Sequence, residues 1–209
     1  MLFYDCSTAP SPRRARMFIA EKGLEIESRE ISMLKGEQMS PEFLAINPRA
    51  TIPVLVTDDG TVLTENLAIA AYLEELHPEI PLMGSTAEER ALVLMWNTIC
   101  ETQGGHAIAD AFRNSNPHMK GRALTGQTNF EQIPELAERA FVRVGLFFDM
   151  IEKRLGQRTF VVGDSFTLAD ITAFVFVDFA RVIKKRVTDE HPNLLAWYEV
   201  MKARPSASL

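Results

Sequence analysis

The spacing of apolar residues changes once along this 209-residue chain, and that change limits the possible fold more than any other feature. Before Pro78, short strand-like runs alternate with helical segments. From about Thr86 onward strand signals are gone, and apolar residues recur at the three- and four-residue spacing of buried helix faces. The pattern predicts a mixed α/β domain over 1–78 and an all-helical domain over 86–209, joined by a linker around Pro78 and Pro81.

The first domain is expected to follow the order β-α-β-α-β-β-α, which mixes parallel and antiparallel pairing. Ser11 precedes Pro12 and marks a helix start, because serine can cap free N–H groups and proline is preformed for the first turn. The turn Asp58-Asp59-Gly60 between two apolar runs indicates a hairpin. The expected elements are a strand at 2–4, a helix from Ser11 to Gly23, a strand at 25–31, a short helix at 41–46, a hairpin at 52–63 and a helix at 66–76.

The second domain is expected to contain four helices, at 86–99, 133–156, 167–179 and 192–203, with a loop or broken helix over 114–130. Thr167 and Asp170 have the spacing of a capping box, with Asp in place of the usual Glu. The helix that follows them is apolar on all sides, which predicts a position in the middle of a bundle.

Composition and charge exclude several classes of protein. A net charge of -6 argues against a nucleic-acid partner, since such a partner selects for a basic face. Cys6 and Cys100 lie far apart and in no metal-ligand spacing, so we expect no metal and a reducing compartment. We see no signal peptide and no apolar run near the roughly 18 residues that a membrane span needs. We therefore expect a soluble cytoplasmic protein.

Pro53 interrupts an apolar run, Ile52 to Val56, that otherwise has the pattern of a central strand. Proline cannot donate to a sheet ladder, so it should stand at the first residue of the strand, at an edge or at a bulge. If the Pro53 peptide bond were cis, the neighbouring backbone would turn outward and could pair with a ligand. An ordinary strand-starting proline would have no such role, and the spacing alone leaves both open.

Three segments, taken together and in order, resemble the cytosolic glutathione transferases of bacterial type. These segments are NPRATIPVLVTDDGTVLTENLAIAAYLEE at 47–75, ARMFIAEKGL at 15–24 and GDSFTLADI at 163–171. The resemblance implies a thioredoxin-like N-terminal domain, a helical-bundle C-terminal domain, glutathione as co-substrate and a homodimer. It also implies the cis form of the bond before Pro53.

The resemblance also assigns residues to glutathione. In the family, the residue before the cis proline pairs through its backbone with the cysteinyl part, which corresponds to Ile52, flanked by Thr51 and Pro53. The pair that holds the γ-glutamyl group corresponds to Glu65 and Asn66, with Asn where the family usually has Ser. The chemistry agrees, because a helix N-terminus favours an anionic carboxylate. A plain N-cap is the alternative role for both residues.

The loop before the first helix offers several candidates for the catalytic group. A thiol with an ordinary pKa of about 8.5 needs a nearby donor or helix N-terminus to be a thiolate at neutral pH. The family's catalytic position corresponds to Ala9, whose side chain donates nothing. Ser11 is the preferred substitute, although it could be an N-cap alone, and Cys6 and Ser7 are second choices.

The second substrate is expected against the first long helix of the helical domain, at Trp96, Asn97 and Phe112, although such residues often belong to a core. The resemblance implies conjugation of glutathione to a small hydrophobic electrophile. A glutathione-dependent isomerase or dehalogenase would share the same site. A non-enzymatic glutathione-binding regulatory protein is the third possibility, and Ala9 is the residue that favours it.

Overall fold

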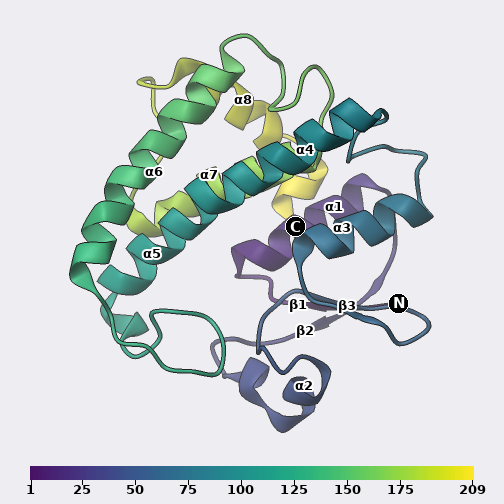
Figure 1. Cartoon of the computed structure of the whole chain (residues 1–209), viewed down its shortest axis with the longest axis vertical. Coiled ribbons are helices and arrows are strands. Elements are labelled where there is room, and N and C mark those ends of the chain that lie inside the picture. The colour runs from purple at the N-terminus through teal and green to yellow at the C-terminus, as the bar shows by residue number, and fades with distance from the viewer. The chain divides into compact units, whose positions relative to one another are not determined.

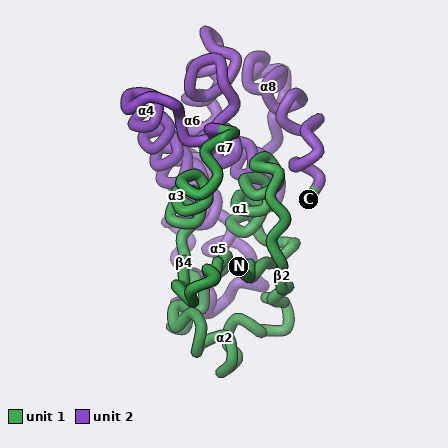
Figure 2. The backbone as a smooth tube through the Cα atoms, turned by 90° about the vertical axis from the view of Figure 1, so that its right-hand side faces the viewer, with its two compact units in different colours: residues 1–80, 124–129, 209 green, residues 81–123, 130–208 purple.

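The computed structural model describes every residue from Met1 to Leu209, and the chain divides into two compact units (Figure 1). Unit 1 contains residues 1–80, 124–129 and Leu209, and unit 2 contains residues 81–123 and 130–208 (Figure 2). The residues 124–129, called the strap segment below, lie far along the chain but belong to unit 1. The sequence pattern had given no indication of this assignment.

Unit 1 is built on a four-stranded sheet in the order β2-β1-β3-β4. The central strand β1 (Leu2–Asp5) pairs in parallel with β2 (Glu27–Glu30) and antiparallel with β3 (Val54–Val56), which pairs antiparallel with β4 (Val62–Leu63). This mixed sheet confirms the predicted thioredoxin-like domain.

The helices of unit 1 are α1 (Pro10–Glu21), α2 (Pro41–Ile46) and α3 (Asn66–Leu76). The predicted start of α1, with Ser11 as the cap and Pro12 in the first turn, is wrong by two residues: Ala9 is the N-cap, Pro10 is the first helical residue, and Ser11 lies inside the first turn. Both prolines fit because the first-turn N–H groups have no intrahelical acceptor to lose. Ser11 therefore caps nothing.

Lys22 joins the end of α1 to the end of α3. Its side chain is 0% exposed, and its ammonium lies 2.5 Å from Glu74 Oε2. The same ammonium donates to the carbonyl oxygens of His77, at 2.6 Å, and Ile80, at 2.7 Å. All three N–H donors of the lysine are thus used, and carbonyls beyond the end of α3 gain a partner.

Unit 2 is all-helical, as predicted, but it has one α-helix more than the four expected, over His106–Ser115. Its helices are α4 (Ala87–Ile99), α5 (His106–Ser115), α6 (Pro134–Leu155), α7 (Leu168–Phe179) and α8 (Pro192–Lys202), and a π-helical turn over Cys100–Gly105 joins α4 to α5. Ten residues of α7 are buried, from Leu168 to Val177, which confirms its central position.

Asp170 closes the start of α7. Its Oδ2 accepts hydrogen bonds from the backbone N–H and the hydroxyl of Thr167, both at 3.0 Å, as the predicted capping box requires. Its Oδ1 accepts from the N–H of Val161 at 2.8 Å and from Trp197 Nε1 at 3.2 Å. Burial nevertheless dominates and raises the pKa of this carboxyl to about 6.

Replacing Lys22 by methionine should lower the free energy of unfolding by about 3–5 kcal/mol, because the carbonyl oxygens of His77 and Ile80 lose their donor and the half-buried Glu74 loses this cation. Urea denaturation followed by circular dichroism measures this loss. The exposed Lys35 provides the control, and Lys35→Met should stay within about 0.5 kcal/mol of wild type. Equal losses in both variants would contradict a structural role for the buried lysine.

Asp170 should give the stability of the protein an unusual pH dependence. Its pKa in the folded state, about 6, lies above its ordinary value of 3.8, so the folded state holds the proton more tightly than the unfolded state. The stability that protonation contributes is complete below the ordinary pKa and is lost as pH rises through about 6. The unfolding free energy of wild type minus that of Asp170→Asn should therefore be larger at pH 4.5 than at pH 7.

The exposed Asp164, in the loop that precedes α7, is the matched control, and Asp164→Asn should show no such trend. A difference for Asp170→Asn that grows toward pH 7 would show that the four accepted hydrogen bonds outweigh burial.

Candidate functional site

The strand registers of unit 1 bring three chain segments to one end of the sheet. Tyr4 lies opposite Val54 in the antiparallel pair of β1 and β3, so the end of β1 meets the start of β3. Leu63, the last residue of β4, lies opposite Leu55, so β4 also ends there. The loop before α1, the residues before β3 and the first turn of α3 are therefore neighbours. We call this end of the sheet the site edge.

The backbone just before β3 is open at the site edge. The Ile52–Pro53 peptide bond is cis, and β3 begins only at Val54. The N–H and C=O groups of Ile52 make no hydrogen bond within the chain. Thr51 faces inward instead, since Asn47 Nδ2 donates to its carbonyl oxygen at 2.7 Å and to its hydroxyl at 3.0 Å. Ile52 thus presents a free backbone edge, and Thr51 supports it.

The start of α3 carries polar groups that its own helix does not use. Glu65 is the N-cap residue, but its carboxylate makes no capping bond and lies 2.9 Å from Arg49 Nη1. Asn66 is the first helical residue, only 8% exposed, and its Oδ1 has no partner. Neither side chain caps α3, so the alternative role of a plain side-chain N-cap holds for neither residue. A buried carbonyl oxygen without a donor is costly, so Asn66 has the character of a binding group.

Sequence reasoning missed two polar residues of unit 1. Arg49 pairs with Glu65, and its place in the turn before Thr51 was the available signal. Gln38, in the segment that follows β2, is 7% exposed, and its Oε1 has no partner. A lone glutamine in a polar segment gives no pattern by which it could have been found.

The three catalytic candidates differ in the structure. Cys6 is 1% exposed, with its Sγ 3.5 Å from Thr8 Oγ1. Ser7 is engaged by Glu30, which accepts from its N–H at 3.0 Å and from its hydroxyl at 3.1 Å. Ser11 is half-buried, and neither its hydroxyl nor its N–H makes a hydrogen bond within the chain. Only Ser11 has donors free for a ligand.

Ser11 also carries the free backbone N–H at the N-terminal, positive end of α1. Pro10 and Pro12 have no N–H, and the N–H of Arg13 is bonded to the carbonyl of Ala9 at 3.4 Å. Ser11 therefore supplies the one free backbone N–H of the first turn, next to its own hydroxyl. Such an end stabilises a nearby anion, a thiolate included.

The three residues expected for the second substrate lie in unit 2. Asn97 cannot line an open pocket: it is 0% exposed, and its Oδ1 accepts from Thr172 Oγ1 at 2.7 Å. It was misplaced because a polar residue beside Trp96 suggested an open face, whereas it pairs with a second buried polar residue on α7. Trp96 and Phe112 are half-buried, and Phe112 makes an edge-on contact with Phe179 at 6.4 Å between ring centroids.

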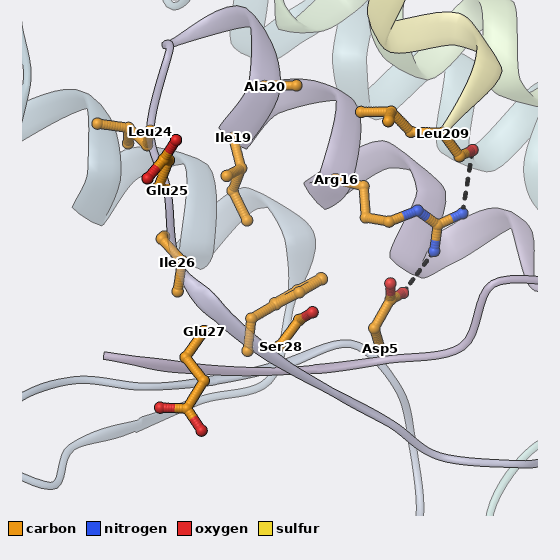
Figure 3. A pocket seen from close by; sticks show the side chains of 11 residues that line it. Asp5, Arg16, Ile19, Ala20, Leu24, Glu25, Ile26, Glu27, Ser28 and Leu209 are labelled. Atoms are coloured by element: carbon orange, nitrogen blue, oxygen red, sulfur yellow. Dashed lines mark hydrogen bonds and ion pairs between the residues drawn. The ribbon is translucent and has the colours of Figure 1, made fainter.

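A pocket of about 460 Å³ lies in unit 1 between α1 and β2 (Figure 3). Arg16 points toward Asp5 at 2.5 Å, and its other head-group nitrogen reaches the Leu209 carbonyl at 3.5 Å. Burial raises the pKa of the Asp5 carboxyl, and the charge of Arg16 opposes that rise. The Arg16 Nε has no partner within the chain. None of the residues proposed to bind a ligand lines this pocket.

The structure contains no group of three or more His, Cys, Asp or Glu side chains arranged to hold a metal ion. Both cysteines are free and buried. None of the helices combines the length and apolar character needed to cross a membrane.

Comparison with known proteins agrees with this geometry. The family model for the glutathione S-transferase N-terminal domain matches residues 8–76, and the model for the glutathione S-transferase C-terminal domain matches residues 113–205. Glutathione S-transferase 2 of Saccharomyces cerevisiae is 35% identical over 99% of this chain and 87% of its own length.

Two solved structures extend the similarity to three dimensions. The crystal structure of Gtt2 from Saccharomyces cerevisiae superposes with a TM-score of 0.90 at 33% identity, covering 100% of this chain and 99% of that one. A class Gtt2 glutathione S-transferase of Vibrio parahaemolyticus superposes with a TM-score of 0.83 at 30% identity, covering 99% and 95%. With both domains matched in order and an open backbone beside a cis proline, the chain belongs to the glutathione S-transferase family of enzymes.

Proposed function

We propose that this enzyme binds glutathione along the site edge and conjugates its thiolate to a small hydrophobic electrophile. The observation that carries the proposal is the buried, unpartnered Oδ1 of Asn66 at the positive end of α3. In a protein that bound no ligand there, a side chain without a buried, unpaired oxygen would be more stable at this position.

Two of the three parts of glutathione, the cysteinyl and the γ-glutamyl, have a complementary group at the site edge. The cysteinyl backbone pairs with the free N–H and C=O of Ile52, in the manner of an added strand. The γ-glutamyl carboxylate lies at the first-turn N–H groups of α3, where the helix dipole favours an anion. The γ-glutamyl ammonium pairs with the exposed Glu65 carboxylate, which the Arg49 guanidinium holds in place, and donates to Asn66 Oδ1 once that buried side chain turns toward the ligand.

In the proposed reaction, the glutathione thiol loses its proton to solvent and the thiolate accepts a hydrogen bond from the hydroxyl of Ser11. The adjacent N–H adds to this stabilisation, so the thiol pKa falls below its ordinary value of about 8.5. The sulfur then forms a bond to the electrophilic carbon, and a leaving group such as chloride departs with its electron pair. Ser11 is a donor in this scheme and never the nucleophile.

We propose that Trp96 and Phe112 provide apolar surface for the electrophile, since aromatic side chains line most small-molecule pockets. We also propose that the enzyme is a homodimer. Phe141, Val142 and Leu146 form an exposed apolar group on α6, and such groups commonly mark contact surfaces. Two free cysteines suit a reducing compartment, and we propose the cytoplasm.

A non-enzymatic glutathione-binding protein is the second candidate, because Ala9 stands at the family's catalytic position. A glutathione-dependent isomerase or dehalogenase is the third. Turnover of 1-chloro-2,4-dinitrobenzene by the purified enzyme distinguishes a conjugating enzyme from a non-enzymatic binding protein. Product analysis with halogenated or isomerisable substrates tests for a dehalogenase or an isomerase.

Replacing Asn66 by leucine should raise the Kd of glutathione about 10- to 100-fold, because a hydrogen bond to a charged ammonium is lost. Asn66→Ser, which restores the residue more usual in the family, should stay within about threefold of wild type. Isothermal titration calorimetry measures both values. A wild-type affinity for Asn66→Leu, or no binding of glutathione to the unmodified enzyme, would contradict the proposed site.

Replacing Ser11 by alanine should lower kcat/KM for 1-chloro-2,4-dinitrobenzene about 100-fold, the effect of removing one donor from a developing or stabilised anion. The kinetic pKa should rise toward about 8.5, since the bound thiol would regain its ordinary acidity. Ser7→Ala is the matched control and should leave turnover nearly unchanged. Unchanged turnover in Ser11→Ala would remove Ser11 from the mechanism and leave the second-choice donors.

A further inference from the structure

We propose that Gln127, in the strap segment, is a positioning residue for glutathione. It acts on the turn of residues 47–51, which sets the positions of both Ile52 and Glu65. This inference rests on the proposed function, because it concerns the affinity of the same site. It assigns a role to a segment that comes from the connection between α5 and α6, far along the chain from the site edge.

Backbone hydrogen bonds join the residues on either side of the strap segment. The N–H of Ala123 donates to the carbonyl of Phe130 at 3.1 Å, and the N–H of Phe130 donates to the carbonyl of Gly121 at 3.2 Å. The chain therefore leaves and re-enters unit 2 at one place, and the strap segment between is counted with unit 1 (Figure 2). A long connection between helices that is kept ordered in this way is commonly functional.

The strap segment touches the turn at two points. Gln127 Nε2 donates a hydrogen bond to the carbonyl oxygen of Pro48. The backbone of Gly126 lies beside Arg49, and a Cβ there would be in ordinary contact, 3.6 Å, with the Arg49 carbonyl oxygen. Gly126 has a φ of +112°, which side chains rarely adopt, so the backbone conformation of the strap segment depends on glycine.

Residues 47–51 move as a unit because the buried Asn47 makes hydrogen bonds to three of them. Asn47 is 1% exposed; its Oδ1 accepts from the N–H of Arg49 at 3.1 Å, and its carbonyl accepts from the N–H of Ala50 at 3.0 Å. Its Nδ2 donates to the carbonyl of Thr51 at 2.7 Å. A shift of the turn at residue 48 is therefore passed to residue 51, next to Ile52.

The same turn also reaches the other half of the ligand site. Arg49 Nη1 lies 2.9 Å from Glu65 Oε1, and both side chains are more than half exposed. An exposed ion pair contributes little to stability, so its use is in orienting the Glu65 carboxylate. Gln127 is itself exposed, and its single hydrogen bond is not needed for the core. Its effect should therefore appear in ligand affinity and not in folding.

The experiment compares Gln127→Ala and Gln127→Glu with Thr128→Ala, an exposed neighbour in the same segment. Loss of the bond to Pro48 should raise the Kd of glutathione, measured by calorimetry, about three- to tenfold in both Gln127 variants. The KM for glutathione should rise equally, while kcat and the KM for 1-chloro-2,4-dinitrobenzene stay at the wild-type level. Hydrogen exchange of the peptide 47–53 should quicken in the Gln127 variants and not in Thr128→Ala.

Gly126→Ala provides an independent variant, because it strains the strap backbone and leaves the Gln127 side chain in place. It should weaken glutathione binding in the same way. Wild-type binding and unchanged exchange in the Gln127 variants would overturn this inference alone. A loss of thermal stability with both KM values raised would also overturn it, since it would show a structural role. Failure of the unmodified enzyme to bind glutathione would overturn the proposed function, and this inference with it.

Discussion

The antiparallel pairing of β1 with β3 is the constraint on which the rest of the site depends. Because Tyr4 lies opposite Val54, the loop that opens α1 and the residues that precede β3 leave the sheet together. The short hairpin then returns β4 to the same end, where α3 begins. The positive ends of two helices and one open backbone segment therefore converge without any long-range side-chain contact. A shift of this register by one residue would separate Ile52 from the helix starts and reverse which side chains face the core.

Several of the groups that converge there have no hydrogen-bond partner within the chain. Pro53 removes a ladder donor, and Ile52 keeps both backbone groups free. Asn66 buries an oxygen without a donor, and Ser11 lies between two prolines with its own donors unused. Elsewhere the side chains of Lys22 and Asp170 are fully paired, whereas Arg16 Nε, Gln38 Oε1, Trp96 Nε1 and His191 Nδ1 are also buried without a partner. The site edge differs because its unpartnered side-chain atom lies with free backbone groups, so one ligand can complete several of them.

The sequence patterns predicted those parts of the fold that depend on interactions between residues close together in the chain. The change in apolar spacing separated the α/β part from the helical part, and the Thr167–Asp170 spacing located the start of a buried helix. Ser11 was misplaced because two prolines each permit a helix start, and a single sequence does not show which one the preceding turn selects. Asn97 was misplaced because its partner Thr172 is 75 positions away. The strap segment and the Arg49–Glu65 pair depend on tertiary contacts of the same kind, which no periodicity reports.

The central claim is that glutathione lies along the site edge, paired with Ile52 and the start of α3. Titration of isotope-labelled enzyme with glutathione, followed through backbone amide chemical shifts, tests it most directly. Saturable shifts should be largest at Ile52, at Asn66 and the next residue of α3, and at Ser11. Shifts confined to the pocket between α1 and β2, or the absence of saturable shifts, would contradict it.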